Sequence, residues 1–168
     1  MRPARMLARM ADHPPLALAL GRIPSGLYIV TTLDSAGRPL GFLGSFVQQF
    51  GFEPPVVGVA VGKGREHLQA IRGSQSFALS ILDQESKQAM PPFFGKLPPG
   101  ATPFDVLAHR APSGRAPILE QALAWLELEP CGEHELADHV VVFGRVLAGG
   151  LRGPGEPLVH LRKNGLAY

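Results

Sequence analysis

Glycine and proline divide this chain into short apolar segments, which limits the folds that it can adopt. Its 168 residues include 20 glycines and 17 prolines. Between them lie segments such as 27–33 and 139–148, which are rich in β-branched and aromatic residues and therefore favour strands. Strands and helices do not alternate regularly along the chain. We therefore expect a mainly β, antiparallel fold.

The same patterns predict six or seven strands and two or three short helices. Strands are expected at 27–33, 39–49, 55–61, 77–82, 119–129, 139–148 and 158–161, and helices at 15–22, 66–72 and 84–90. The proline- and glycine-rich segment 96–114 is expected to be a long surface excursion. Residues 15–168 are expected to form one domain after a flexible N-terminus, 1–14. Closure into a barrel would remove the free edges of such a sheet.

The overall composition limits the classes of partner. Hydrophobic residues make up 45% of the chain and charged residues only 18%, against a usual charged share of about 25%. A surface so poor in charge favours an oligomer that covers apolar surface, and a large bound cofactor would also cover some of it. The formal net charge of +2, without a long basic run, argues against nucleic-acid binding. No apolar run approaches the roughly 18 residues that span a membrane, and a single cysteine, Cys131, suggests a reducing, cytoplasmic setting.

The segment 37–52 combines small, polar and aromatic residues in a way that suits a flat, polar-edged ligand. Gly41, Gly44 and Ser45 are expected to bend a strand and expose backbone donors beside Gln48 and Gln49. Oxidised flavin needs such donors along the polar edge of its ring. A glycine-rich β-bulge at a barrel corner explains the same residues without a ligand.

The turn Gly62-Lys63-Gly64-Arg65 lies between a predicted apolar strand and a predicted helix. The N-terminus of a helix offers free N–H groups and a positive partial charge, and two cations here would add to it. This is not a Walker A loop, because the glycine required before the Gly-Lys pair is Val57 and the residue after Lys63 is Gly64. The turn is either a phosphate site or an ordinary exposed turn.

The histidines do not indicate a metal site or a hydrolytic centre. His134 and His139 are five residues apart, whereas a metalloprotease helix spaces its histidines four apart. The spacing supports no Ser-His-Asp or Cys-His catalytic arrangement. The GxGxxG fingerprint of a Rossmann nicotinamide site is absent from the sequence. His139, directly after Asp138, is a candidate for facing a ligand. His13, His67 and His109 have no convergent partners and are interpreted as incidental.

Seven short segments of the chain together resemble one known family. They are ALGRIPSGLYIVTT at 19–32, GSFVQQFGFEPP at 44–55, VAVGKGRE at 59–66, FALSIL at 77–82, PILEQALAWLELE at 117–129, ADHVVVFGRV at 137–146 and VHLRKNGLAY at 159–168. In order and spacing, the chain resembles the flavin reductase-like, FMN-binding split-barrel family, including the flavin reductase domain of photosynthetic flavodiiron proteins. The resemblance implies a six-stranded antiparallel Greek-key split barrel with a few short helices, forming a homodimer with FMN near the interface.

The resemblance also implies roles for particular residues. It places the FMN ring and ribityl chain along 43–47, the ring edge at 48–49, the phosphate at 63–65, and a bound nicotinamide beside His139. The basic C-terminal segment would approach the cofactor. The implied cofactor-binding residues are Leu43, Gly44, Ser45, Phe46, Val47, Gln48, Gln49, Lys63, Gly64, Arg65, His139, His160 and Arg162. The family usually has glycine before the Asp-His pair, where this chain has Ala137.

The function implied by the resemblance is an oxidoreductase of the NAD(P)H:flavin reductase type. FMN rather than FAD is the expected cofactor, NAD(P)H is the expected co-substrate, and no resident metal or catalytic acid is required. Two alternatives stay open. One is an FMN-bound electron-transfer module that serves a partner protein, and the other is a split barrel that has lost flavin and binds another ligand.

Overall fold

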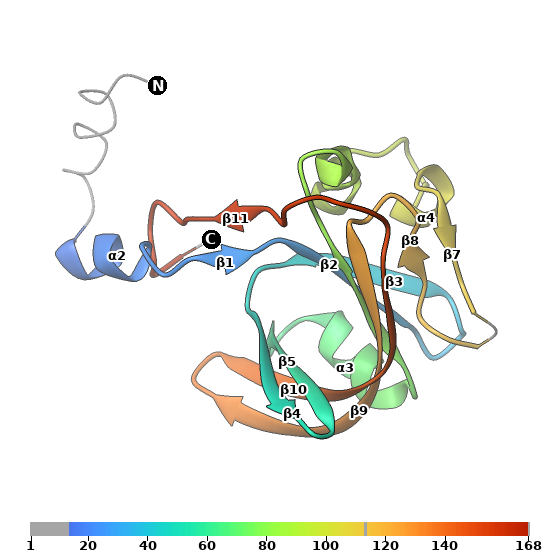
Figure 1. Ribbon diagram of the computed structural model, residues 1–168, viewed down its shortest axis with the longest axis horizontal. Coiled ribbons are helices and arrows are strands. Elements are labelled where there is room, and N and C mark those ends of the chain that lie inside the picture. Colours follow the sequence, from blue (N-terminus) through green and yellow to red (C-terminus); the bar gives the residue numbers. More distant parts are fainter. Residues whose placement is uncertain (1–13, 113, 168) are drawn as a thin grey trace. The chain divides into compact units, whose positions relative to one another are not determined.

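The computed structural model describes residues 14–112 and 114–167, which fall into two compact units (Figure 1). The first unit combines the chain up to Ser25 with the chain from Val159 onward. It contains α2 (Pro15–Leu20) and β11 (Val159–His160), and β11 pairs with β1 (Ser25–Gly26) in a two-stranded sheet. The predicted flexible N-terminus, except Pro14, lies outside the described residues.

The second unit, Gly26–Leu158, is built around one antiparallel sheet. Its order is β3-β2-β6-β9-β10-β5-β4, and every neighbouring pair is antiparallel. The strands are β2 (Tyr28–Leu33), β3 (Pro39–Gly44), β4 (Val47–Phe52), β5 (Pro55–Gly62), β6 (Phe77–Ile81), β9 (Ala124–Leu136) and β10 (His139–Leu151). The prediction of a mainly β, antiparallel fold is confirmed.

The sheet has seven strands where the family resemblance implied six, and the difference lies in one segment. β3 and β4 occupy the two ends of the strand order, yet only Ser45 and Phe46 separate them in the chain. They correspond to the single strand predicted at 39–49. The chain itself therefore joins the two ends of the sheet, as a barrel requires. Counting the interrupted strand once gives six.

The segment between β6 and β9 contains more structure than the sequence predicted. The helix expected at 84–90 is a short 3₁₀ helix, η1 (Ser86–Ala89), and a second one, η2 (Pro91–Phe94), follows where we expected a stop. Paired prolines are compatible with the first turn of a helix, where no N–H is needed.

The prediction that 96–114 is a surface excursion without regular structure was wrong in part. It contains α4 (Pro103–Val106), closed by a capping box between Thr102 and Asp105. It also contains β7 (His109–Arg110), which pairs with β8 (Ile118–Leu119). The strand predicted at 119–129 is consequently divided between β8 and β9.

Two of the three hydrophobic clusters in the second unit make up most of its core. The larger contains Phe77, Leu79 and Leu128 together with valines of β5 and β10. It also contains Leu68 and Ile71 of α3 (Glu66–Gly73), as the amphipathic pattern predicted. The smaller lies under the 3₁₀ helices, around Ile29 and Leu82. α3 thus packs on the sheet through one apolar face.

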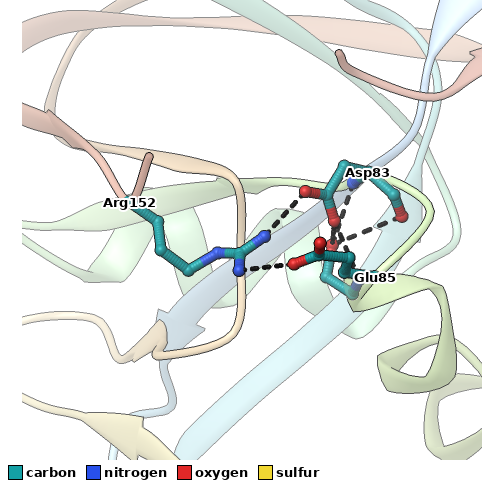
Figure 2. Close-up of polar contacts among 4 residues, drawn as sticks. Asp83, Glu85 and Arg152 are labelled. Carbon is teal, nitrogen blue, oxygen red and sulfur yellow. Dashed lines mark hydrogen bonds and ion pairs between the residues drawn. The ribbon is translucent and has the colours of Figure 1, made fainter. Parts of the chain in front are cut away.

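A polar cluster attaches the end of β10 to the turn after β6 (Figure 2). The Asp83 carboxylate accepts hydrogen bonds from the Ser86 amide at 2.8 Å and the Ser86 hydroxyl at 2.6 Å. Arg152 reaches both Asp83 and Glu85, each at 2.7 Å. Asp83 is buried, and the hydrogen bond from the Ser86 side chain, with Arg152 nearby, holds the pKa of its carboxyl below the usual range.

Replacing Asp83 with asparagine is expected to destabilise the protein at neutral pH and to have little effect in acid. A carboxyl whose pKa is lowered by folding stabilises the fold above its unfolded pKa of about 4, and this contribution is lost as pH falls through the folded pKa. Thermal unfolding between pH 2.5 and 7 should show a difference of roughly 1–3 kcal/mol at neutral pH. A difference that does not depend on pH would contradict the assignment, and Glu120→Gln, at an exposed carboxyl, is the control.

Candidate functional site

The interruption between β3 and β4 places a short stretch of backbone where the two ends of the sheet meet. Ser45 is buried, with 9% of its surface exposed, and the Phe46 carbonyl accepts a hydrogen bond from the Ala60 amide at 2.9 Å. Gly44 lies so close to the neighbouring strand β2 that an added Cβ would be 3.1 Å from the Val30 side chain. A side chain at Gly44 would therefore crowd the buried Val30 of the neighbouring strand, so packing against β2 accounts for this glycine.

The turn at 62–65 leads directly into α3. Arg65 is the N-cap residue, and no side chain caps the first-turn N–H groups of this helix. Within the described part of the chain, the Arg65 side chain has no hydrogen bond or ion pair. An uncapped helix N-terminus beside a cation without a partner is suited to an anion.

Lys63, the other cation of the turn, is already paired. Its ammonium group forms an ion pair with Glu135 of β9, which lowers the pKa of that carboxyl, and its amide donates to the Asp138 carbonyl at 3.0 Å. A second ion pair, Arg72 with Glu133 at 2.8 Å, joins α3 to the same strand. The β9–β10 hairpin is thus attached to both the turn and the helix.

His139 begins β10 and lies beside both segments. It pairs in register with Gly62, and its ring contacts Phe46 edge-on with the centroids 5.7 Å apart. Its Nδ1 lies 2.8 Å from Asp138, and this hydrogen bond lowers the pKa of the Asp138 carboxyl. The fold therefore brings His139, which is more than 70 residues further along the chain, beside the β3–β4 junction and the basic turn, which the β4–β5 hairpin connects.

The remaining predicted site residues are less closely grouped. Leu43 and Val47 are partly buried. Gln48 and Gln49 are exposed on β4, and the Gln49 amide donates to the Gly51 carbonyl at 3.0 Å. His160 and Arg162 belong to the first unit. Their predicted place near the cofactor stays a prediction.

His67 is the residue that the sequence interpretation missed. Its Nε2 lies 3.2 Å from the Gly41 carbonyl of β3, and its ring packs edge-on against Phe42 with the centroids 4.9 Å apart. His67 is therefore not incidental. His109 also has partners, the Leu107 carbonyl and the Phe104 ring. The partners of His109 are local, whereas Gly41 is 26 positions from His67, so the His67 contact could not be read from sequence spacing.

Other site types find little support in the described residues. Among residues 14–112 and 114–167, no group of three or more His, Cys, Asp or Glu side chains could hold a metal ion. None of the described helices has the length and apolarity to cross a membrane. An open, polar pocket is lined by residues that include Pro54, Gln75, Glu129 and Arg145, and it contains none of the predicted site residues.

The β9–β10 turn places Ala137 in a backbone conformation that favours glycine. Its φ is 49°, in the left-handed region that costs an L-residue with a Cβ about 1–2 kcal/mol. Ala137→Gly is therefore expected to raise the free energy of unfolding by about 1 kcal/mol, measured by denaturant titration. Ala60→Gly, within β5, is the control and should lower it by about 0.5–1 kcal/mol. Equal losses at both positions would contradict the strain assignment.

Comparison with known proteins agrees with the resemblance seen in the sequence. Residues 20–165 match the model of the flavin reductase like domain. A diflavin flavoprotein A of Synechocystis is 38% identical over 156 residues, which are 91% of this chain but 27% of that protein. The stachydrine N-demethylase reductase subunit of Rhizobium meliloti is 33% identical, over 89% of this chain and 65% of its own length.

A solved structure supports the fold. The NADH:FAD oxidoreductase of Streptomyces globisporus superimposes with a TM-score of 0.77 and 26% identity, over 87% of this chain and 86% of that one. The chain spans about a quarter of the length of the diflavin flavoproteins and about two thirds of the Rhizobium subunit.

Proposed function

The chain belongs to the flavin reductase-like family, and on this premise we propose that it binds FMN and serves as an NAD(P)H:flavin reductase. One observation carries the proposal. His139 lies beside the β3–β4 junction and the basic turn at 62–65, although the sequence separates it widely from both. These are the segments that a flavin ring, its phosphate and a nicotinamide would need.

The residues present fit a flavin with a terminal phosphate. Backbone around Ser45 would hold the ring and the ribityl chain, with Gln48 and Gln49 at the ring edge. Arg65 and the uncapped N-terminus of α3 would hold the phosphate. Bound flavin supplies the hydride chemistry, while the protein binds and orients it. His139, oriented by Asp138 and packed on Phe46, would border the nicotinamide.

FMN is preferred over FAD because its phosphate is a terminal monoester, which presents more charge to Arg65 and the helix N-terminus than an internal pyrophosphate does. The Streptomyces structural relative is named for FAD and NADH, so both flavins and both nicotinamides belong in the test. A cytoplasmic location is part of the proposal and rests on the single cysteine.

The test is oxidation of NADH or NADPH by the purified protein, followed by absorbance with FMN, FAD or no added flavin. We expect oxidation that depends on flavin and is fastest with FMN. His139→Ala should raise the KM for the nicotinamide while leaving FMN affinity within about twofold. A protein that binds neither flavin nor nicotinamide would contradict the proposal, and it would favour a barrel that has lost flavin.

An electron-transfer module is the second candidate. The relatives called diflavin flavoproteins are about four times as long as the matched region, so in those proteins the equivalent segment is accompanied by other parts. In this alternative FMN stays bound while a partner protein is reduced. Gel filtration after reduction separates the two cases, because a module retains its flavin and a reductase releases it.

A homodimer is also proposed, and exposed aromatic residues on β4 support it. Phe52 is 88% exposed and Phe50 is 61% exposed, with Phe50 packed edge-on against Phe143 of β10. Large apolar side chains so exposed are typical of an interface. Phe52→Glu is expected to shift the mass measured by light scattering from dimer toward monomer, whereas Val106→Glu on α4 should not. A monomeric wild-type protein would contradict the proposal.

A further inference from the structure

His67 occupies a junction between the two halves of the proposed flavin site. It lies in the first turn of α3, two residues after Arg65, and its bonding partner Gly41 lies on β3, two residues before Leu43. α3 packs against β2, β3 and β5. Because β3 is at an end of the strand order, a carbonyl that points away from β2 has no neighbouring strand to pair with. The His67 ring supplies that partner.

The hydrogen-bond partners determine the tautomer of His67. A carbonyl oxygen can only accept, so Nε2 must carry the hydrogen. Nδ1 is buried and has no hydrogen-bond partner among the described residues. A neutral ring leaves Nδ1 as an acceptor, whereas a protonated ring would place a donor and a charge there without a partner. Burial accordingly lowers the pKa of His67.

Gly41 is held tightly on this strand. A Cβ at this position would lie 2.9 Å from the Phe93 ring and 3.1 Å from the Phe104 ring. The strand is therefore confined by η2 and α4 as well as by the hydrogen bond from α3. A change at His67 would release one of these constraints while the aromatic contacts remain.

We propose that His67 is a positioning residue for flavin, whose Nε2–H bond to Gly41 holds the anion-binding end of α3 in place against the strand that leads to the flavin ring. The inference rests on the proposed function. It assigns to His67 neither contact with the ligand nor a chemical step. Its effect is to fix the spacing between the phosphate site and the ring site.

The arrangement predicts weaker flavin binding in acid, because protonation keeps the Nε2–H bond to Gly41 but places an unpartnered charge at the buried Nδ1, which disfavours this position of the ring. Two charged groups act on the pKa of His67, Glu66, which favours protonation, and Arg65, which opposes it. From the packed strands, β3 and β5 contribute no titratable side chain and β2 contributes only Tyr28. Since the folded pKa lies below the usual value of about 6.5, the neutral ring is fully present above that pH and is lost as pH falls through the folded pKa.

The test compares His67→Gln, His67→Asn and His67→Leu with the wild type. A glutamine amide nitrogen can take the place of Nε2, whereas an asparagine amide is too short to reach Gly41. FMN and riboflavin affinities are measured by fluorescence titration from pH 5 to 8. Thermal unfolding without flavin confirms that each variant is folded. Gln69→Leu, at an exposed position of the same helix, is the control.

We expect the asparagine and leucine variants to bind FMN about tenfold more weakly, and the glutamine variant to bind within about threefold of the wild type. Because riboflavin lacks the phosphate group, the asparagine and leucine variants should bind it nearly as well as the wild type does. The acid loss of FMN affinity should be smaller in the glutamine variant than in the wild type.

Equal FMN affinity in the wild type and in the folded asparagine and leucine variants would overturn the inference while leaving the proposed function intact. Equal losses in the glutamine and asparagine variants would also overturn it. If the leucine variant fails to fold, the comparison of FMN affinity between the glutamine and asparagine variants tests the inference. A wild-type protein that binds no flavin contradicts the proposed function itself, so the two failures are distinguishable.

Discussion

Arg65→Ala is expected to weaken FMN binding by about ten- to one-hundredfold, corresponding to roughly 1.5–3 kcal/mol for a hydrogen bond to a charged group. The Arg65 side chain has no hydrogen bond or ion pair among the described residues, and it stands at the uncapped N-terminus of α3. Its guanidinium can therefore meet a phosphate without breaking an existing ion pair. The dissociation constant from a fluorescence titration at fixed ionic strength measures the effect.

Lys63→Ala is the control for Arg65→Ala, and it should weaken FMN binding much less. The Lys63 ammonium is engaged with Glu135, so a phosphate would have to displace a carboxylate to gain it. Riboflavin, which lacks the phosphate, should bind the wild type and the Arg65→Ala variant equally well. Equal losses at the two positions, or the same loss with riboflavin, would show that Arg65 does not bind the phosphate.

Phe77→Ala is expected to have the largest effect on stability, lowering the free energy of unfolding by roughly 3–5 kcal/mol. Phe77 is completely buried in β6 and belongs to the larger hydrophobic cluster. Its ring lies over Gly144 of β10, where an added Cβ would be 2.4 Å from the ring. Removing the ring leaves a cavity that these strands cannot readily close. Urea unfolding followed by circular dichroism measures the loss.

Gly144 allows a double-mutant test of this packing. Gly144→Ala should destabilise the wild type because its new methyl group overlaps the Phe77 ring. In the Phe77→Ala background the same substitution should cost less or even stabilise, since the methyl group enters the cavity. Additive losses would contradict the contact. Phe94→Ala, at an exposed aromatic residue, is the control and should change stability by about 0.5 kcal/mol or less.

The fold was predictable where local sequence determines it. β-branched runs located β2, β5 and β10, a short apolar run located β6, and the amphipathic segment 66–72 located α3. The glycines of 39–49 predicted a bent strand, and the structure breaks it at Ser45 and Phe46. The helix predicted at 84–90 corresponds to η1, but η2, α4 and β7 were not predicted, because proline-rich segments carry no clear periodicity and their structure depends on packing.

The site was predictable only in part. The family resemblance identified the segments, but not the side-chain partners that they acquire. Lys63 and Glu135 are 72 positions apart, and Asp83 and Arg152 are 69 apart, so such pairs depend on the strand order rather than on any local motif. His67 was overlooked for the same reason, since its partner Gly41 lies on another element. The turn at 62–65 supplied two equivalent cations in sequence, and the structure distinguishes them.

A crystal structure of the protein with FMN is the most direct test of the central claim that one site spans the β3–β4 junction and the turn at 62–65. The account predicts the ring beside Ser45 and the phosphate against Arg65 and the first turn of α3, with His139 bordering the ring. Flavin bound elsewhere, for example in the polar pocket near Glu129 and Arg145, or a phosphate remote from Arg65, would contradict it.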